Sequence, residues 1–310
     1  MNFSFDEFAN PDPSLTGYAP FGAYETWYSV TGSLESSLTP IIVIHGGPGS
    51  THDYVTPLRQ IALGGYPVIH YDQVGCGFSS QLGEAEIADL TMEFFLDELN
   101  NLIQWLGVAD DYILLGHSWG GMVALEHALL QPKGLSAVIL SSALASAATW
   151  KSEAIRLGSA LAGRAGEDFR AMKNGTPTTS ETYGLINRAY STAHLFSGPV
   201  NWVDSGIDPE FDSGDAVYRA LWGSSEFDFD GRFGTWSVVD RLGEVTTPTL
   251  VIWGEHDEST RLVNSELLQG IWESVEAEIL GGGHVTWADA LTPYLAAVMS
   301  FLGALDGERA

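Results

Sequence analysis

The amino-acid sequence predicts an α/β protein in which a mostly parallel central sheet is flanked by helices and carries an inserted, mainly helical cap. Three observations predict it. Short apolar runs end in glycine or polar residues, which is typical of strands buried on both faces. Helical patterns separate these runs, and such alternation favours a parallel sheet. The strand pattern stops near residue 145 and resumes only at Pro248.

The expected strands follow in chain order. Residues 24–30 alternate between apolar and polar side chains, which predicts a half-exposed strand that pairs antiparallel at the sheet edge. Continuous apolar runs predict five buried strands. These runs are residues 40–45, 66–71, 112–116, 136–140 and 249–253.

Apolar residues at helical spacing predict one helix between Met92 and Leu106 and another between Met122 and Leu129. The region without strand patterns is best interpreted as a helical insertion. We therefore expect the first part of the core at residues 1–144, the cap at 145–236 and the second part of the core at 237–310.

Charge and cysteine content restrict the partners. Forty acidic residues against 13 basic ones give a formal charge of -27, and this field repels nucleic acid and anionic membranes. The acidity is either a solvated surface or, in part, a site for cationic ligands. Cys76 is the only cysteine, and the start of the chain has no signal-like pattern. We expect a soluble cytoplasmic protein.

The segment 116–120 reads Gly-His-Ser-Trp-Gly and matches the G-x-S-x-G pattern of a nucleophilic serine. It follows a predicted buried strand and precedes a predicted helix, which is the context that this motif requires. Glycines leave room for a sharp turn, and the helix N-terminus favours developing negative charge. The sequence predicts that Ser118 is a catalytic nucleophile.

A serine hydroxyl needs a base, and the base needs a carboxylate that orients it. Asp257 follows the predicted strand at 249–253, and His284 follows a run of three glycines before a final helix. Both stand in the order Ser, acid, His that this fold uses. Asp72 is the rival acid, but it precedes the serine and sits in a tight turn, where we expect it to support the loop.

The segment 45–49, His-Gly-Gly-Pro-Gly, follows a strand and is rich in exposed backbone N–H groups. We assign the oxyanion donors to the N–H groups of Gly47 and Trp119, with Gly46 as support of the loop. A phosphate-binding turn is the alternative, but neither the G-K-[ST] ending nor dinucleotide spacing is present. No H-E-x-x-H or Cys/His cluster occurs, so we expect neither a metal nor a cofactor.

These segments together resemble the proline iminopeptidase family of α/β-hydrolases, which includes tricorn-interacting aminopeptidases and L-amino acid amidases. The resemblance rests on residues 45–49, on Tyr-Asp-Gln at 71–73 with the glycines that follow, on the serine motif, and on Gly-Glu-His-Asp-Glu at 254–258. It covers nearly the whole chain and is weakest in the cap. It implies the α/β-hydrolase fold and release of an N-terminal residue, or of ammonia or an amine from an amino acid amide.

The resemblance also implies that Glu226 and Glu258 bind the free amine of the substrate. An α-amino group is largely protonated at neutral pH, and a semi-buried carboxylate pair binds it through charge-assisted hydrogen bonds. Two such carboxylates repel each other, which raises at least one pKa until a cation binds. The partner is thus expected to be a small molecule or short peptide with a free amino group.

Several alternatives stay open. Cap aromatics form either a substrate pocket or simply the core of the cap, and Cys76 is either thiol-sensitive or an inert buried residue. A carboxylesterase or a xenobiotic (aryl)amidase that ignores the amine is a second interpretation, and a non-catalytic receptor on a hydrolase fold is a distant third. The preferred side chain, the leaving group and the oligomeric state are not indicated. The cap aromatics are Trp202 beside Asn201, Trp222, Phe227, Phe229, Phe233 and Trp236.

Overall fold

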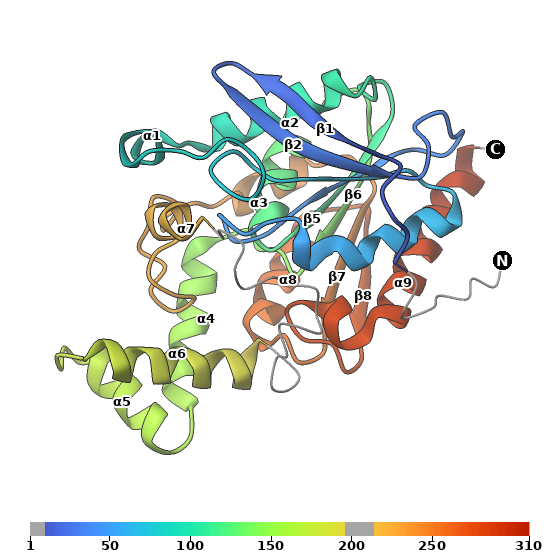
Figure 1. Ribbon diagram of the computed structural model, residues 1–310. Helices are drawn as coiled ribbons and strands as arrows, with labels where there is room; N and C mark the ends of the chain where they lie inside the picture. Colours follow the sequence, from blue (N-terminus) through green and yellow to red (C-terminus); the bar gives the residue numbers. More distant parts are fainter. Residues whose placement is uncertain (1–9, 196–213, 310) are drawn as a thin grey trace.

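A sheet with strand order β1-β2-β4-β3-β5-β6-β7-β8 runs through the computed structural model, which describes residues 10–195 and 214–309 (Figure 1). The pairs β1–β2 and β2–β4 are antiparallel, and all later neighbours in this order are parallel. The mostly parallel α/β architecture is thereby confirmed. The strands are β1 (Leu15–Phe21), β2 (Tyr24–Thr31), β3 (Ile41–Ile44), β4 (Val68–Tyr71), β5 (Tyr112–His117), β6 (Leu135–Ser141), β7 (Thr249–Gly254) and β8 (Ser274–Ile279).

The five buried strands and the early strand lie where the sequence predicts them, but two strands have no counterpart in the prediction. β1 takes the sheet edge, so the expectation that residues 24–30 form the edge is wrong. β8 forms the opposite edge and carries Glu276 and Glu278. Edge strands are half solvated and keep polar residues, so neither β1 nor β8 has a continuous apolar run.

Helices cover the two faces of the sheet, and the alternation of side chains along the strands divides the core between them. Leu114 of β5 packs with α2 (Met92–Trp105), α3 (Trp119–Leu129) and α8 (Glu258–Gly270). Its neighbours Ile113 and Leu115 point to the other face, with η1 (Asp53–Gly64) and α9 (Thr286–Arg309). Two short elements complete the core, α1 (Glu84–Asp89) and η2 (Val239–Glu244).

In the described part of the chain, α9 alone contains a segment, 286–307, long and apolar enough to cross a membrane by composition. The structure gives that apolar character another explanation. Tyr294, Leu295 and Val298 are fully buried against the sheet. This is the packing of a core helix in a globular protein.

The region expected to be the cap contains four helices among the described residues, and α4 to α6 extend away from the sheet (Figure 1). Its two ends lie side by side, because Ala147 N donates to Trp236 O and Val238 N donates to Ala145 O, both at 2.9 Å. The helices are α4 (Ala147–Ala160), α5 (Gly163–Lys173), α6 (Ser180–His194) and α7 (Asp215–Leu221).

Aromatic side chains fill the inside of this region. Trp222 stacks on Phe229 with ring centroids 3.7 Å apart, and its edge contacts Trp150 at 5.8 Å. Phe227 packs edge-on against Phe169 at 5.2 Å, and all five side chains are buried. These contacts favour the interpretation of the aromatics as the core of the cap; Asn201 and Trp202 lie outside the described residues.

A buried acid joins α2 to the loop after β4. Glu98 is fully buried, and its Oε1 accepts hydrogen bonds from Thr26 Oγ1 at 2.7 Å and from Val74 N at 2.9 Å. Its Oε2 has no partner among the described residues. Burial raises the pKa of Glu98 from 4.5 to about 8, against the opposing effect of these two hydrogen bonds.

Glu98 is therefore predicted to make stability pH-dependent. Between pH 4.5 and about 8 the folded chain keeps a proton that the unfolded chain releases, so the free energy of unfolding falls as pH rises through this window. The slope is at most about 1.4 kcal/mol per pH unit for one proton. Glu98→Gln removes this proton and should flatten the curve.

Urea unfolding of the wild type and of Glu98→Gln across this pH range measures the effect. The solvent-exposed Glu93 of the same helix supplies the matched control, Glu93→Gln, which should keep the wild-type slope. Parallel curves for the wild type and Glu98→Gln would contradict the prediction.

Candidate active site

Ser118 lies on a sharp turn between β5 and α3. Its φ of 52° and ψ of -116° are strained for a residue with a side chain. A Cβ at Gly116 would stand 2.3 Å from Gly120 O, and a Cβ at Gly120 would stand 2.1 Å from Ile44 O. Only glycine fits at both positions. The turn, which we call the elbow (residues 116–120), therefore presses directly on the end of β3.

His284 and Asp257 meet beside the elbow. His284 Nδ1 lies 2.8 Å from Asp257 Oδ2, and the Asp257 carboxylate is buried. Two backbone contacts of His284 hold its loop in place. The N–H of His284 donates to Leu195 O at 2.5 Å, and the carbonyl oxygen of His284 lies 2.9 Å from His117 Nε2. Because His117 adjoins Ser118, the three residues predicted as a triad gather at one end of the sheet.

The electrostatics around His284 favour its protonated form. Burial disfavours the imidazolium, but the charge and hydrogen bond of Asp257 and the charge of Glu226 outweigh that effect. The net result is that the pKa of His284 is raised above 6.5. A base of this kind is stabilised once it has accepted a proton.

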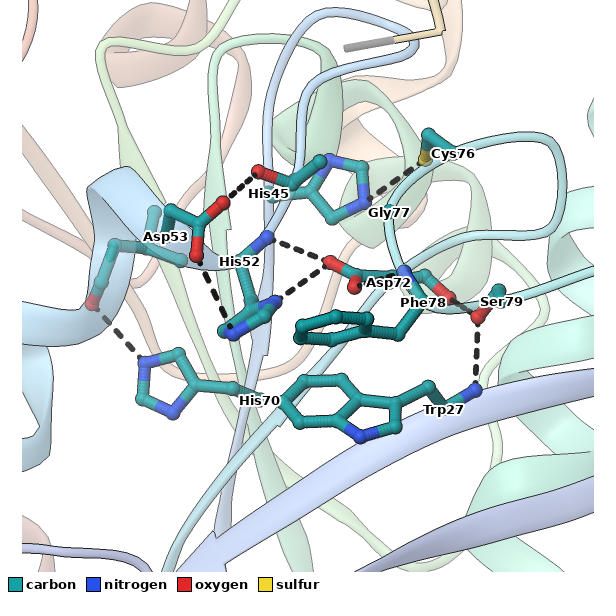
Figure 2. A network of polar contacts seen from close by, with 12 residues as sticks. Trp27, His45, His52, Asp53, His70, Asp72, Cys76, Gly77, Phe78 and Ser79 are labelled. Carbon is teal, nitrogen blue, oxygen red and sulfur yellow. Dashed lines mark hydrogen bonds and ion pairs between the residues drawn. The ribbon is translucent and has the colours of Figure 1, made fainter. Parts of the chain in front are cut away.

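Asp72, the rival acid, has other partners (Figure 2). Its Oδ1 accepts hydrogen bonds from His52 N at 2.7 Å and His52 Nδ1 at 2.9 Å, and its Oδ2 accepts one from Phe78 N at 2.9 Å. A Cβ at Gly77 would stand 2.2 Å from Asp72 Oδ2. The carboxylate thus ties two loops together, and its histidine partner is His52. No spacing in the sequence marks His52.

Of the residues assigned to the oxyanion site, Trp119 is part of the elbow and Gly46 is joined to it through Tyr54. Trp119 is the first residue of α3, so its N–H has no acceptor inside the helix. Gly47 has a φ of 111°, which favours glycine. Gly46 N donates to Tyr54 Oη at 2.5 Å, and the same oxygen lies 2.8 Å from His117 Nδ1.

The two glutamates assigned to the amine have different environments. Glu226 is half-buried, and its Oε1 accepts a hydrogen bond from Tyr218 Oη at 2.9 Å. Burial raises the pKa of Glu226, and the carboxylate that adds to this effect is Asp257. Glu258 begins α8 with its side chain 50% exposed, and its Oε2 lies 3.2 Å from His194 Nδ1. The cause expected for the raised pKa, repulsion between the two glutamates, is therefore wrong.

Two residues near this site have no sequence signal of their own. Tyr218 lies on α7 and orients Glu226, while Trp150 of α4 donates from Nε1 to Glu226 O at 3.0 Å. The Trp150 ring also lies 5.9 Å from the ring of His284. Both come from the cap, so only the folded chain brings them to the end of the sheet.

Cys76 is buried near the same loops. Its Sγ lies 3.0 Å from Gln73 O and 3.8 Å from His45 Nε2. Within residues 10–195 and 214–309, no group of three His, Cys, Asp or Glu side chains is arranged to hold a metal ion.

Comparison with known proteins places this site in a family. The family model described as alpha/beta hydrolase fold matches residues 39–289. A proline iminopeptidase of Lactiplantibacillus plantarum is 31% identical over 294 residues, which cover 93% of this chain and 100% of the relative. One from Levilactobacillus brevis is 33% identical over 299 residues, which cover 93% and 96%.

A solved structure gives the same result. The crystal structure of a proline iminopeptidase from Mycobacterium smegmatis superposes with a TM-score of 0.84 at 34% sequence identity, covering 96% of this chain and 100% of that one. Fold, chain coverage and sequence identity agree with the resemblance in the catalytic segments. The chain belongs to the proline iminopeptidase family of α/β-hydrolases and is a serine hydrolase of the aminopeptidase type.

Proposed function

We propose that this protein hydrolyses the amide or peptide bond that follows an N-terminal amino acid with a free amine, through Ser118, His284 and Asp257. N-terminal proline belongs to the proposed substrates because the relatives are named proline iminopeptidases. The observation that carries the proposal is the half-buried Glu226, whose backbone oxygen accepts a hydrogen bond from Trp150 Nε1 at 3.0 Å while the Trp150 ring lies 5.9 Å from the ring of His284. In agreement with this position, the charge of Glu226 helps to raise the pKa of His284. This carboxylate offers a cationic amine a partner beside the nucleophile.

The proposed first step forms an acyl-enzyme. His284 takes the Ser118 hydroxyl proton on Nε2 while Oγ attacks the substrate carbonyl carbon, and the carbonyl electron pair moves to oxygen. The N–H groups of Gly47 and Trp119 stabilise this oxyanion. When the carbonyl re-forms, the C–N bond breaks and His284 delivers its proton to the leaving nitrogen.

Water completes the cycle in the proposed second step. His284 takes a proton from the water as its oxygen attacks the acyl carbon. Collapse of the second oxyanion breaks the Ser118 ester and returns a proton to Oγ, so the enzyme regains its starting protonation. Asp257 accepts the hydrogen bond from Nδ1–H of His284 throughout and keeps the imidazole oriented, as the 2.8 Å contact favours.

Glu226 is proposed to read the amine. An α-amino group with a pKa near 8 is mostly an ammonium at neutral pH. Placing it against Glu226 offsets the burial that raises the pKa of this carboxyl, so the ionised glutamate and the cation stabilise each other. Tyr218 donates a hydrogen bond to Oε1 of this carboxylate and holds it in place. Glu258, the first residue of α8, is proposed to add a second negative charge for the amine.

The amine requirement gives the first prediction for activity. Proline anilide should be hydrolysed at least about 100-fold faster than N-acetylproline anilide, because blocking the amine removes a charged hydrogen bond inside the site. Glu226→Gln should lower kcat/KM for the free-amine substrate by a similar factor and leave the slow acetylated reaction nearly unchanged.

Glu278→Gln is the matched control, since it removes one charge from an exposed residue of β8 that pairs with Arg261. Equal rates on free and blocked substrates would overturn the proposed amine site and favour a carboxylesterase or arylamidase. Biological activity that persists in Ser118→Ala would favour a receptor on a hydrolase fold.

The pH dependence supplies a separate prediction. His284 acts as a base only when neutral, so the rate should rise with pH through its folded pKa, with a midpoint above 6.5. Glu226→Gln removes one of the charges that raise this pKa, so its midpoint should move to lower pH. The rate at which a fluorophosphonate labels Ser118 is the measurement. Because this reagent has no amine, its rate reports the activation of Ser118 by His284 without any contribution from amine binding.

In this experiment Glu278→Gln should keep the wild-type midpoint. A midpoint below 6.5 in the wild type, or the same midpoint in Glu226→Gln, would show that Glu226 does not act on His284.

A further inference from the structure

We propose that Gln73 is the positioning residue that fixes the two oxyanion donors relative to each other. Gln73 follows β4 and is 1% exposed, and among the described residues its side chain forms hydrogen bonds with His45 and Trp119, not with Ser118 or His284. This inference rests on the proposed function in one respect, namely that the N–H groups of Gly47 and Trp119 are the oxyanion donors. It adds Gln73 as a residue that acts through both donors.

We call the hydrogen bonds that join Gln73 to Trp119 and to His45 the brace. One end of the brace is Trp119. Its indole Nε1 lies 2.9 Å from Gln73 Oε1, and the Trp119 side chain is fully buried. An indole N–H only donates, so the atom that faces it has to be the amide oxygen. This contact fixes the orientation of the Gln73 amide, and it anchors the residue whose backbone N–H begins α3.

The other end is His45, at the start of the oxyanion loop (residues 45–49). Gln73 N donates to His45 Nε2 at 3.0 Å, and Gln73 Nε2 donates to His45 O at 3.3 Å. Burial lowers the pKa of His45, so the ring is neutral. Because Nε2 accepts, the proton is on Nδ1, and Nδ1 donates to Gly46 O at 2.9 Å.

This bond sets the direction of the proposed donor. In a planar trans peptide the carbonyl oxygen and the next N–H point in opposite directions. With Gly46 O held at the His45 ring, the N–H of Gly47 points away from that ring. A continuous chain of buried hydrogen bonds thus joins the orientation of Gly47 to Trp119 through His45 and Gln73. Figure 2 shows His45, whose ring lies next to Cys76.

The brace bridges segments that are far apart in sequence. The oxyanion loop follows β3, Gln73 follows β4 and Trp119 follows β5, and β3 lies between the other two strands. Oxyanion donors act only when they lie about 2.7–3.1 Å from the developing charge, and losing one costs about 10²–10³ in kcat. A side chain that ties both donors to one amide protects this geometry.

The experiment compares Gln73→Met with Gln60→Met. Gln60 is also 1% exposed, but it lies on η1 and its Oε1 has no partner among the described residues, so it controls for the loss of a buried amide. We expect Gln73→Met to slow fluorophosphonate labelling of Ser118 and kcat at least about tenfold, with KM for a free-amine anilide within about twofold. Gln60→Met should keep both labelling and kcat within about twofold.

Trp119→Phe keeps a ring and removes the indole donor, so it tests the same contact without changing Gln73. If the brace acts as one unit, Gln73→Met combined with Trp119→Phe should be no slower than Gln73→Met alone. Gln73→Glu retains an acceptor for Trp119 but loses the N–H that reaches His45 and adds a buried negative charge near the oxyanion, so it should be at least as slow as Gln73→Met. These variants keep the test decisive if Gln73→Met does not fold.

Wild-type labelling rates in folded Gln73→Met, or strictly additive losses in the double variant, would overturn the inference. Failure of the proposed amine recognition has a different signature. In that case free and acetylated substrates react equally in every variant, while the labelling rate still depends on Gln73. Labelling that persists in Ser118→Ala would overturn both, since the nucleophile would lie elsewhere.

Discussion

The close approach of Gly120, in the elbow, to the carbonyl oxygen of Ile44 is the constraint on which the rest of the site depends. A side chain at Gly120 would collide with that carbonyl, so the elbow can press on the end of β3 only as glycine. This contact puts Ser118 beside the oxyanion loop. It also sets the strained backbone that presents Ser118 at the end of β5. Because β5, β7 and β8 are parallel, the loops after β7 and β8, which carry Asp257 and His284, lie at the same end of the sheet as Ser118.

Charge is proposed to give this site its selectivity. The chain carries a formal charge of -27, but the acids that matter to the account are few and partly buried. Asp257 and Glu226 both stabilise a proton on His284, and Glu226 comes from the cap, whose helices approach the end of the sheet. Catalytic strength and amine recognition are thereby linked, because the carboxylate proposed to bind the ammonium also acts on the base. Beneath them, neutral His45 and Gln73 are proposed to orient the oxyanion donors without adding charge where the oxyanion would develop.

Local patterns were enough to predict the buried strands, the elbow and the family. A strand buried on both faces needs a continuous apolar run, and a sharp turn around the serine needs glycines at fixed positions, so both can be identified within one short segment. The edge strands were not predicted because a half-solvated strand lacks a continuous apolar run, as in β8 with its two glutamates. The roles of Tyr218, Trp150 and His52 were not predicted for another reason. Their contacts join segments distant in the sequence, and nothing in residue type or spacing marks them before the chain folds. Repulsion between Glu226 and Glu258 was also the wrong cause to expect for the raised pKa, because the carboxylate that adds to the effect of burial on Glu226 is Asp257.

A crystal structure of the enzyme with the boronic acid analogue of proline bound would test the proposed site most directly. We expect a covalent bond between Ser118 Oγ and boron. One boronate oxygen should lie within hydrogen-bond distance of the N–H groups of Gly47 and Trp119, and the ring ammonium should lie on the Glu226 carboxylate. A boronate bound to Ser118 with its ammonium turned to solvent and away from Glu226, or no bond to Ser118, would contradict the proposed site.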